Sequence, residues 1–221
     1  QNITITGNLK FDITIPAAQF EIGTELRERH GRRLTWLAAS TREGEEALLL
    51  DALIHLEIPH LLLLLVPRHP QRFDAVAGLL AERGLATVRR SSRQPLQTDT
   101  QVYLGDSMGE MVAYYRLADL AFIGGSLLPL GGQNLIEAAA CGCPVVVGPH
   151  TFNFLQATAD AIAAGAACRV TDPAGLAAVI DEAFGGPARL AAMRAAASGF
   201  AAAHRGATAR TVALIEATVK A

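Results

Sequence analysis

The chain has 221 residues, a length that suits one large domain, and a formal net charge of -2. Hydrophobic residues make up 51% of it and aromatic residues 5%, so the expected core is aliphatic. The charge balance and the lack of a basic run argue against nucleic-acid binding, which needs a positive face. The longest apolar run, 61–66, is far shorter than the roughly 20 residues that span a bilayer, and the first residues lack a secretory leader pattern. We therefore expect a soluble chain.

From residue 34 onward, apolar segments typical of strands alternate with segments of helical periodicity. The run 61–66 is aliphatic throughout, as in a strand buried on both faces of a sheet. The expected strands are 34–38, 61–66, 86–89, 101–104, 120–123, 144–147 and 167–170. The expected helices are 45–56, 72–83, 108–118, 134–140, 154–164, 174–183, 188–203 and 208–219. This alternation predicts an α/β fold of the doubly wound, Rossmann-like class, with a parallel sheet and helices on both faces.

The first 30 residues fit this pattern less well. The stretch 3–6 alternates like a strand, and 7–12 looks like a connector from an earlier part of a protein. No internal repeat or low-complexity linker divides the remainder. We therefore predict a lead-in or interdomain segment over 1–30 and one Rossmann-like domain over 31–221.

Ligands of open α/β sheets bind beyond the carboxyl ends of the strands, which directs attention to the loops there. The loop after residue 123 has two glycine pairs and leads into a helix with Asn134 and Glu137 in its first turn. Such a helix start favours phosphate, and the Glu137 carboxylate can accept hydrogen bonds from both hydroxyls of a ribose. The alternative is a capping box in which Glu137 folds back onto Asn134. The neighbouring glycines favour the ligand site.

Arg68 follows the buried strand 61–66 directly, after Pro67. A guanidinium at this place can pair with phosphate or carboxylate in two-pronged fashion, and a solvated loop arginine is the alternative. Its neighbour His69 is interpreted as structural. The segment 40–44, after the first expected strand, is a further candidate for phosphate or sugar contact.

The segment 105–110 also follows an expected strand and enters a helix. We expect Asp106 or Ser107 to cap that helix. Met108 and Glu110 are then placed to contact a base, the first by packing and the second by hydrogen bonds. Loose capping alone remains an open alternative for this loop.

Several known motifs are missing from the sequence. It has no G-x-x-x-x-G-K-[ST] loop, no G-x-G-x-x-G after its first strand and no G-x-S-x-G, which argues against P-loop, nicotinamide-dependent and α/β-hydrolase enzymes. Cys141, Cys143 and Cys168 lack the spacing of a zinc site, and we interpret them as small buried residues. What remains is nucleotide binding through backbone amides and a ribose-binding glutamate, with no metal or cofactor expected.

Seven ordered motifs resemble those of the 3-deoxy-D-manno-octulosonic-acid (Kdo) transferases of Gram-negative lipopolysaccharide synthesis. They are residues 6–12, 40–46, 67–70, 105–110, 124–126, 131–137 and 148–154. The resemblance runs from residue 3 to about 155 and more loosely to the end. The family has the GT-B architecture of two Rossmann-like domains facing a cleft, and this chain resembles its second, CMP-Kdo-binding domain.

The resemblance implies that CMP contacts a defined set of residues. They are Pro67, Arg68, Met108, Gly109, Glu110, Asn134, Leu135, Ile136 and Glu137. It also implies that the catalytic glutamate and the membrane anchor lie in an N-terminal domain outside this sequence, at the cytoplasmic face of the inner membrane. The acceptor would be a lipid A precursor, and this domain alone would be inactive.

Two departures from the family pattern are Gln133, where a histidine is common, and Leu130, where an arginine is common. The second removes a charge contact expected of that loop. Two other functions stay open on the residues alone. One is a GT-B transferase or epimerase that uses a UDP-sugar, and the other is a non-catalytic module that senses a nucleotide or docks a partner.

Overall fold

The computed structural model describes residues 3–31 and 33–219, apart from the side chain of Arg29, and its centre is a seven-stranded parallel sheet. Residues 1–2, 32 and 220–221, which belong to the predicted lead-in and domain, lie outside this description. The strands are β1 (Thr35–Thr41), β2 (Leu62–Pro67), β3 (Thr87–Arg89), β4 (Val102–Leu104), β5 (Leu120–Ile123), β6 (Val145–Val147) and β7 (Ala167–Arg169). Their spatial order is β3-β4-β2-β1-β5-β6-β7. This confirms the predicted doubly wound α/β class.

The strand order reverses between β1 and β5. From β1 the chain builds outward through β2 to the edge strand β3 and returns to place β4 between them, and from β5 it builds in the opposite direction through β6 and β7. The connections that leave these two strands therefore diverge and leave a crevice at the carboxyl edge of the sheet. This is the edge at which the sequence predicts a ligand.

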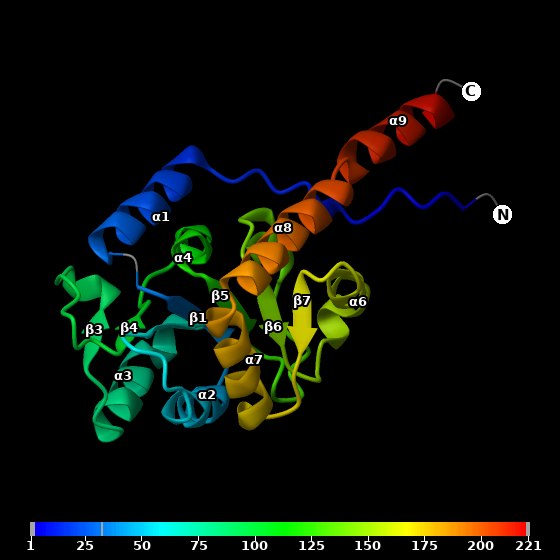
Figure 1. The fold of residues 1–221 in the computed structure, drawn as a ribbon. Helices are drawn as coiled ribbons and strands as arrows, with labels where there is room; N and C mark the ends of the chain where they lie inside the picture. Colours follow the sequence, from blue (N-terminus) through cyan, green and yellow to red (C-terminus); the bar gives the residue numbers. More distant parts are fainter. Residues whose placement is uncertain (1–2, 32, 220–221) are drawn as a thin grey trace.

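Helices cover both faces of the sheet, as Figure 1 shows. The α-helices are α1 (Ala17–Arg29), α2 (Glu45–Ile54), α3 (Phe73–Glu82), α4 (Met111–Leu117), α5 (Ile136–Ala140), α6 (Leu155–Ala163), α7 (Pro173–Gly185), α8 (Pro187–Ala203) and α9 (Ala207–Val219). Short 3-10 turns lie at Leu9–Phe11, Pro70–Arg72, Arg90–Ser92 and Phe152–Phe154. Alternate strand residues point to opposite faces, so Trp36 packs in one apolar core with α2, α3 and α7, and Leu37 packs in the other with α4 and α5. Strand β2 is apolar throughout because both of its faces are buried.

The lead-in contains a helix that the sequence analysis did not predict. Helix α1 packs against α4, where the Arg116 guanidinium lies 3.7 Å from the centre of the Phe20 ring. Arg27 of α1 and Arg194 of α8 both bond to one oxygen of the buried Asp119 carboxylate, at 2.7 and 2.5 Å. The other oxygen accepts the N–H of Thr35 at 2.8 Å. Asp119 thus ties α1 and α8 to the amino edge of the sheet.

The first described residues form no strand, so the expectation for 3–6 is wrong. Ile3 and Ile5 are exposed, and the segment runs beside α9 instead of pairing with the sheet (Figure 1). Asp12 accepts the backbone N–H groups of Gly206 and Thr208 and so caps α9 across the chain. The division into a lead-in over 1–30 and a domain over 31–221 stays a prediction.

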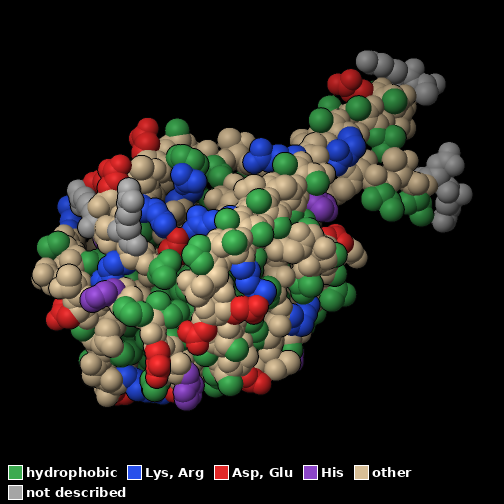
Figure 2. Space-filling model, viewed as in Figure 1, with side chains coloured by type: hydrophobic (Ala, Val, Ile, Leu, Met, Phe, Trp, Pro, Cys, Tyr) green, Lys and Arg blue, Asp and Glu red, His purple; other side chains and the backbone are tan. Residues whose placement is uncertain are grey.

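Helix α9 and the first residues project from the body of the molecule, and Figure 2 shows hydrophobic side chains on this arm. Val212, Leu214, Ile215 and Val219 of α9 are all exposed. Among the described residues, no helix combines the length and the apolarity that crossing a bilayer requires.

Candidate functional site

A cavity of about 230 Å³ opens at the carboxyl edge of the sheet, beside the crevice between β1 and β5. It brings together seven of the nine residues expected to contact a nucleotide. These are Pro67, Arg68, Met108, Gly109, Glu110, Asn134 and Glu137. They come from three loops that are far apart in the sequence, and the three meet because their strands end at the same edge. The other residues of the wall are Ser40, Val66, Ser107, Met111, Tyr114, Tyr115 and Gln133.

Leu135 and Ile136 do not line the cavity with their side chains. Leu135 is 1% exposed and Ile136 is fully buried, and both pack in the core on the α4 face. Any contact between these two residues and a ligand would have to use their backbone atoms. Their apolar side chains instead anchor the start of α5 against the sheet.

Asn134 and Glu137 contact each other through their side chains, but they do not form the capping box considered above, because the N-cap of α5 is Leu135 and it makes no side-chain cap hydrogen bond. The Asn134 amide donates to Glu137 Oε1 at 3.2 Å, and its Oδ1 accepts the N–H of Ile136 at 3.0 Å. Helix α5 begins only at Ile136 and has five residues, so its dipole is small. Carboxylate oxygens have two acceptor directions each, so this contact leaves Glu137 able to accept further hydrogen bonds.

The glycines of the loop after β5 have a structural reason. A Cβ on Gly124 would lie 2.3 Å from the carbonyl oxygen of Ser40, which leaves no room for any other residue. Gly125, Gly131 and Gly132 have φ values of 72°, 90° and 75°, a region that favours glycine. The residues of this loop that reach the cavity wall are Gln133 and Asn134, and not the glycines. The glycines therefore support the loop's path and are not evidence of a ligand by themselves.

A buried carboxylate holds this loop in place. Glu45, at the start of α2, is fully buried and accepts the backbone N–H groups of Gly125 at 2.5 Å, Arg42 at 3.0 Å and Leu127 at 3.1 Å. Burial raises the pKa of Glu45, and the three N–H donors oppose that rise. This role of Glu45 was not predicted from the sequence.

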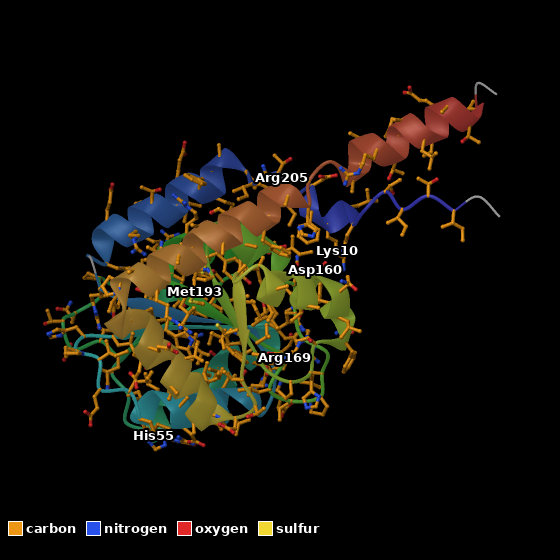
Figure 3. The ribbon with its side chains drawn as sticks, turned by 45° about the vertical axis from the view of Figure 1, so that its right-hand side comes forward. Lys10, His55, Asp160, Arg169, Met193 and Arg205 are labelled. Carbon is orange, nitrogen blue, oxygen red and sulfur yellow. The ribbon has the colours of Figure 1, made fainter. Side chains whose placement is uncertain are left out.

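The loop after β6 is also braced, and it contributes no residue to the cavity wall. Arg169, labelled in Figure 3 at the end of β7, donates to the carbonyl oxygens of Gly148 and Pro149 and to the hydroxyl of Thr151, at 3.0–3.2 Å. Asn153 donates to the carbonyl oxygens of Leu130 and Gly132. This motif therefore supports the glycine-rich loop and does not itself face the ligand position.

The capping role expected of Asp106 and Ser107 is wrong. Helix α4 begins at Met111, and its N-cap position is Glu110, without a side-chain cap. Asp106 instead accepts hydrogen bonds from Ser91 and from the Arg89 guanidinium, at 2.5–2.8 Å. Burial favours a higher pKa for Asp106, but the bonds from Ser91 and Arg89 outweigh it and lower the pKa. The start of this loop is therefore held by the hydrogen bonds from Ser91 and Arg89 to Asp106, and not by a helix cap.

Glu110 sits in a dense set of hydrogen bonds beside the cavity. Arg90 approaches it in two-pronged fashion, with Nε 3.0 Å from Oε2 and Nη2 2.8 Å from Oε1. Ser107 donates to Oε2 at 2.5 Å. Burial alone would raise the pKa of Glu110, but the bonds from Arg90 and Ser107 lower it. Arg90 lies on the turn after β3, a strand end that the sequence analysis did not consider.

Arg68 projects from the end of β2 and its side chain is exposed, while its backbone N–H bonds to the carbonyl oxygen of Thr41 at 3.0 Å. His69 is likewise exposed. Ser40, which also lines the cavity, has a φ of 56° at an irregularity in the pairing of β1 with β2. Such bulges commonly lie next to binding sites, where they turn a strand end away from its regular path.

The described residues contain no group of three or more His, Cys, Asp or Glu side chains that could hold a metal ion. All three cysteines are free thiols, and Cys143 is buried as expected, whereas Cys141 and Cys168 are only half-buried. Burial raises the pKa of Cys141 to about 11, and it also raises the pKa of Cys143. These two thiols are therefore protonated at neutral pH, as expected of small structural residues.

Comparison with known proteins places this chain in a family. Residues 46–199 match the family model "Glycosyl transferases group 1". A 3-deoxy-D-manno-octulosonic acid transferase of Bordetella pertussis is 50% identical over 220 residues, which cover 96% of this chain and 51% of the relative. The corresponding enzyme of Haemophilus influenzae is 43% identical over 157 residues, 70% of this chain and 37% of the relative. The chain thus spans about half the length of these relatives, or less.

Solved structures agree with this placement. The C-terminal CMP-Kdo binding domain of WaaA from Acinetobacter baumannii has a TM-score of 0.78 and 33% identity, with 84% of this chain and 98% of that domain covered. Anabaena HepE in complex with UDP and glucose has a TM-score of 0.60 at 15% identity, a likeness of fold alone. The fold is therefore that of the C-terminal domain of a GT-B glycosyltransferase. The chain belongs to the 3-deoxy-D-manno-octulosonic acid (Kdo) transferase family and corresponds to its C-terminal domain.

Proposed function

We propose that the cavity binds CMP-Kdo, and that the intact enzyme transfers Kdo from it to a lipid A precursor. The main support is the 33% identity to a CMP-Kdo binding domain of which this chain covers 98%. Seven of the nine residues expected to contact CMP line one cavity, which fits this assignment. The transfer would occur at the cytoplasmic face of the inner membrane, and this domain alone would be inactive.

In the proposed complex the three loops recognise different parts of the nucleotide. Glu137 would accept hydrogen bonds from the ribose hydroxyls, using acceptor capacity that Asn134 leaves open. Arg68, exposed at the cavity mouth, would pair with the phosphate. Met108 is 58% exposed beside Glu110, and it would pack against the base. Leu135 and Ile136 would contribute through their backbone.

The proposed reaction is a direct displacement with inversion at the anomeric carbon. The acceptor hydroxyl oxygen forms the new bond, the bond from the anomeric carbon to the phosphate oxygen breaks, and CMP leaves with the electron pair. A glutamate outside this sequence, implied by the family resemblance, takes the hydroxyl proton. Arg68 would offset the charge on the leaving phosphate, which stabilises the transition state electrostatically.

An NMR titration of this chain with CMP, using UMP and AMP as controls, tests the binding proposal. We expect shifts confined to amides around Arg68, Met108–Glu110 and Asn134–Glu137, with CMP preferred. Glu137→Ala should weaken CMP binding by about 1.5–3 kcal/mol, the value of hydrogen bonds to a charged group. Glu82→Ala, an exposed change on α3, is the matched control. Shifts centred elsewhere on the surface, or equal responses to all three nucleotides, would refute the proposal.

A further inference from the structure

The turn after β3 is fastened to the donor loop, residues 105–110, by three consecutive residues. Arg89 and Ser91 bond to Asp106, and Arg90 between them bonds to Glu110. Strands β3 and β4 are paired in register at their ends, Arg89 opposite Leu104, so the turn after β3 lies beside the loop after β4. The residues that hold the donor loop in shape therefore come from the edge strand of the sheet, outside the cavity.

The two oxygens of the Glu110 carboxylate have different numbers of hydrogen-bond partners. Its Oε2 atom has three partners, the Arg90 Nε at 3.0 Å, the Ser107 hydroxyl at 2.5 Å and the Tyr114 hydroxyl at 3.3 Å. Its Oε1 atom is bonded to Arg90 at 2.8 Å. Since each carboxylate oxygen can accept about two hydrogen bonds, Oε1 is the atom with capacity for a ligand donor. The Glu110 side chain is 17% exposed, and Glu110 lines the cavity.

The groups around Glu110 keep it charged. They are Arg90 after β3, Tyr103 on β4, Ser107 on the same loop and Tyr114 on α4. Burial raises the pKa of both tyrosines, so they are neutral near pH 7. The Asp106 carboxylate at the start of the loop is paired with Arg89. Arg90 is therefore the cation in direct contact with Glu110, and its own pKa is raised by that hydrogen bond.

A charged carboxylate accepts hydrogen bonds and donates none. Cytosine presents an amino group at the position where uracil presents a carbonyl oxygen, and carboxylates are suited to accept from that amino group. A carbonyl oxygen facing the same carboxylate is repelled. A fixed, ionised Glu110 would therefore favour binding of cytosine over binding of uracil.

We propose that Arg90 is a positioning residue that holds Glu110 as a charged acceptor with Oε1 open, and thereby sets the preference of the cavity for cytosine over uracil. The inference rests on the proposed function, since it assumes that a pyrimidine nucleotide occupies the cavity. The turn after the edge strand β3 would then contribute to base specificity without contacting the ligand.

Binding of CMP and UMP to the wild-type chain and to Arg90→Gln, Arg90→Lys and Glu110→Gln tests this role. The wild type should prefer CMP by about tenfold to a hundredfold, the range for one hydrogen bond to a charged group. Arg90→Gln should remove most of that ratio, and Arg90→Lys should restore part of it, because lysine keeps the charge but not the two-pronged geometry. Circular dichroism and the fluorescence of the buried Trp36 verify that each variant is folded.

Two further measurements separate positioning from general support. In Arg90→Gln the half-buried carboxyl of Glu110 loses its cation, so UMP binding should improve as the pH falls and Glu110 gains a proton that it can donate. In a double-mutant cycle, Arg90→Gln should change the CMP to UMP ratio little once Glu110 is already Gln. Arg93→Gln is the matched control, since it removes an exposed cation that follows the same turn and is not among the groups bonded to Glu110 in the described part of the chain.

The outcomes distinguish this inference from the proposed function. A wild-type chain that binds CMP, with a CMP to UMP ratio unchanged in Arg90→Gln, would overturn the inference alone. It is also overturned if Arg90→Gln weakens CMP and UMP by one common factor, as expected of a purely structural role. A wild-type chain that binds neither nucleotide in the cavity would overturn the proposed function and the inference with it.

Discussion

Replacing Glu45 by glutamine should destabilise the domain, because this buried carboxylate organises the loop after β5. Its Oε2 atom accepts the N–H groups of Gly125 and Arg42, and its Oε1 atom accepts that of Leu127. An amide keeps one acceptor oxygen and presents N–H donors in place of the other. At best the glutamine oxygen replaces Oε2, so that the N–H of Leu127 then faces another donor.

The expected magnitude follows from that lost bond. A buried backbone N–H without a partner costs about 1–3 kcal/mol, and relief of the buried charge offsets a part of it. We expect a net loss of about 2 kcal/mol for Glu45→Gln, a large share of a typical stability of about 5–15 kcal/mol. Glu45→Ala removes all three bonds and leaves a void, so it should cost more, about 4 kcal/mol.

Urea unfolding, followed by the fluorescence of the single tryptophan, Trp36, measures this loss. At a slope of about 2 kcal/mol per molar urea, the midpoint should fall by about 1 M. Amide exchange at Gly125 and Leu127 should accelerate in the folded state. Glu43→Gln is the control, because Glu43 is exposed in the turn that precedes α2 and should change stability by less than about 0.5 kcal/mol. A Glu45→Gln midpoint equal to that of the wild type would refute the bracing role.

Three other changes examine further parts of this arrangement. Gly124→Ala places a Cβ 2.3 Å from the Ser40 oxygen and should lower the stability of the domain by about 1–3 kcal/mol. Gly78→Ala, in open space on α3, is its control and should raise the stability by about 0.5–1 kcal/mol. Equal urea midpoints for the two variants would contradict this expectation. Folding lowers the pKa of Asp106 below its unfolded value of 3.8. The ionised carboxylate therefore stabilises the folded domain fully at pH values above 3.8, and this contribution is lost as the pH falls through the folded pKa. The deficit of Asp106→Asn should thus be largest at neutral pH and shrink below pH 3.8, and a constant deficit would argue against the assignment. Asp119→Asn should cost about 2 kcal/mol and speed amide exchange in α1 before the rest of the domain, and uniform exchange would show that Asp119 does not hold α1.

The sheet could be predicted from the sequence because its strands carry a strong and simple signal. Segments such as 61–66 and 120–123 are apolar throughout, which follows from burial on both faces. Helix α1 gave no such signal. It buries Leu26 while most of its other described side chains face solvent, and it is held by a cation against an aromatic ring and by the Arg27–Asp119 pair. Contacts of this kind leave no periodic pattern.

The cavity was predicted in outline because parallel strands end at one edge. The rule that located the loops after β2, β4 and β5 applies equally to β3, a strand that was expected at 86–89. Arg90 was missed because it does not line the cavity and reaches the site only through its hydrogen bonds to Glu110, a pairing that no motif in the sequence marks. Tyr114 and Tyr115 were missed for another, since buried positions on a short helix have the same pattern whether they face the core or the floor of a cavity.

The charges of the cavity constrain how it would hold a nucleotide. Arg90 offsets Glu110, and the remaining charged residues of the wall are Arg68 and Glu137, which are of opposite sign. Among the described residues, the wall as a whole therefore offers no excess of positive charge to attract a phosphate. Recognition of the phosphate would have to be local, through Arg68 and main-chain N–H groups. The exposure of Arg68 fits that task, because an arginine with an unrestricted side chain can turn toward the phosphate as it enters.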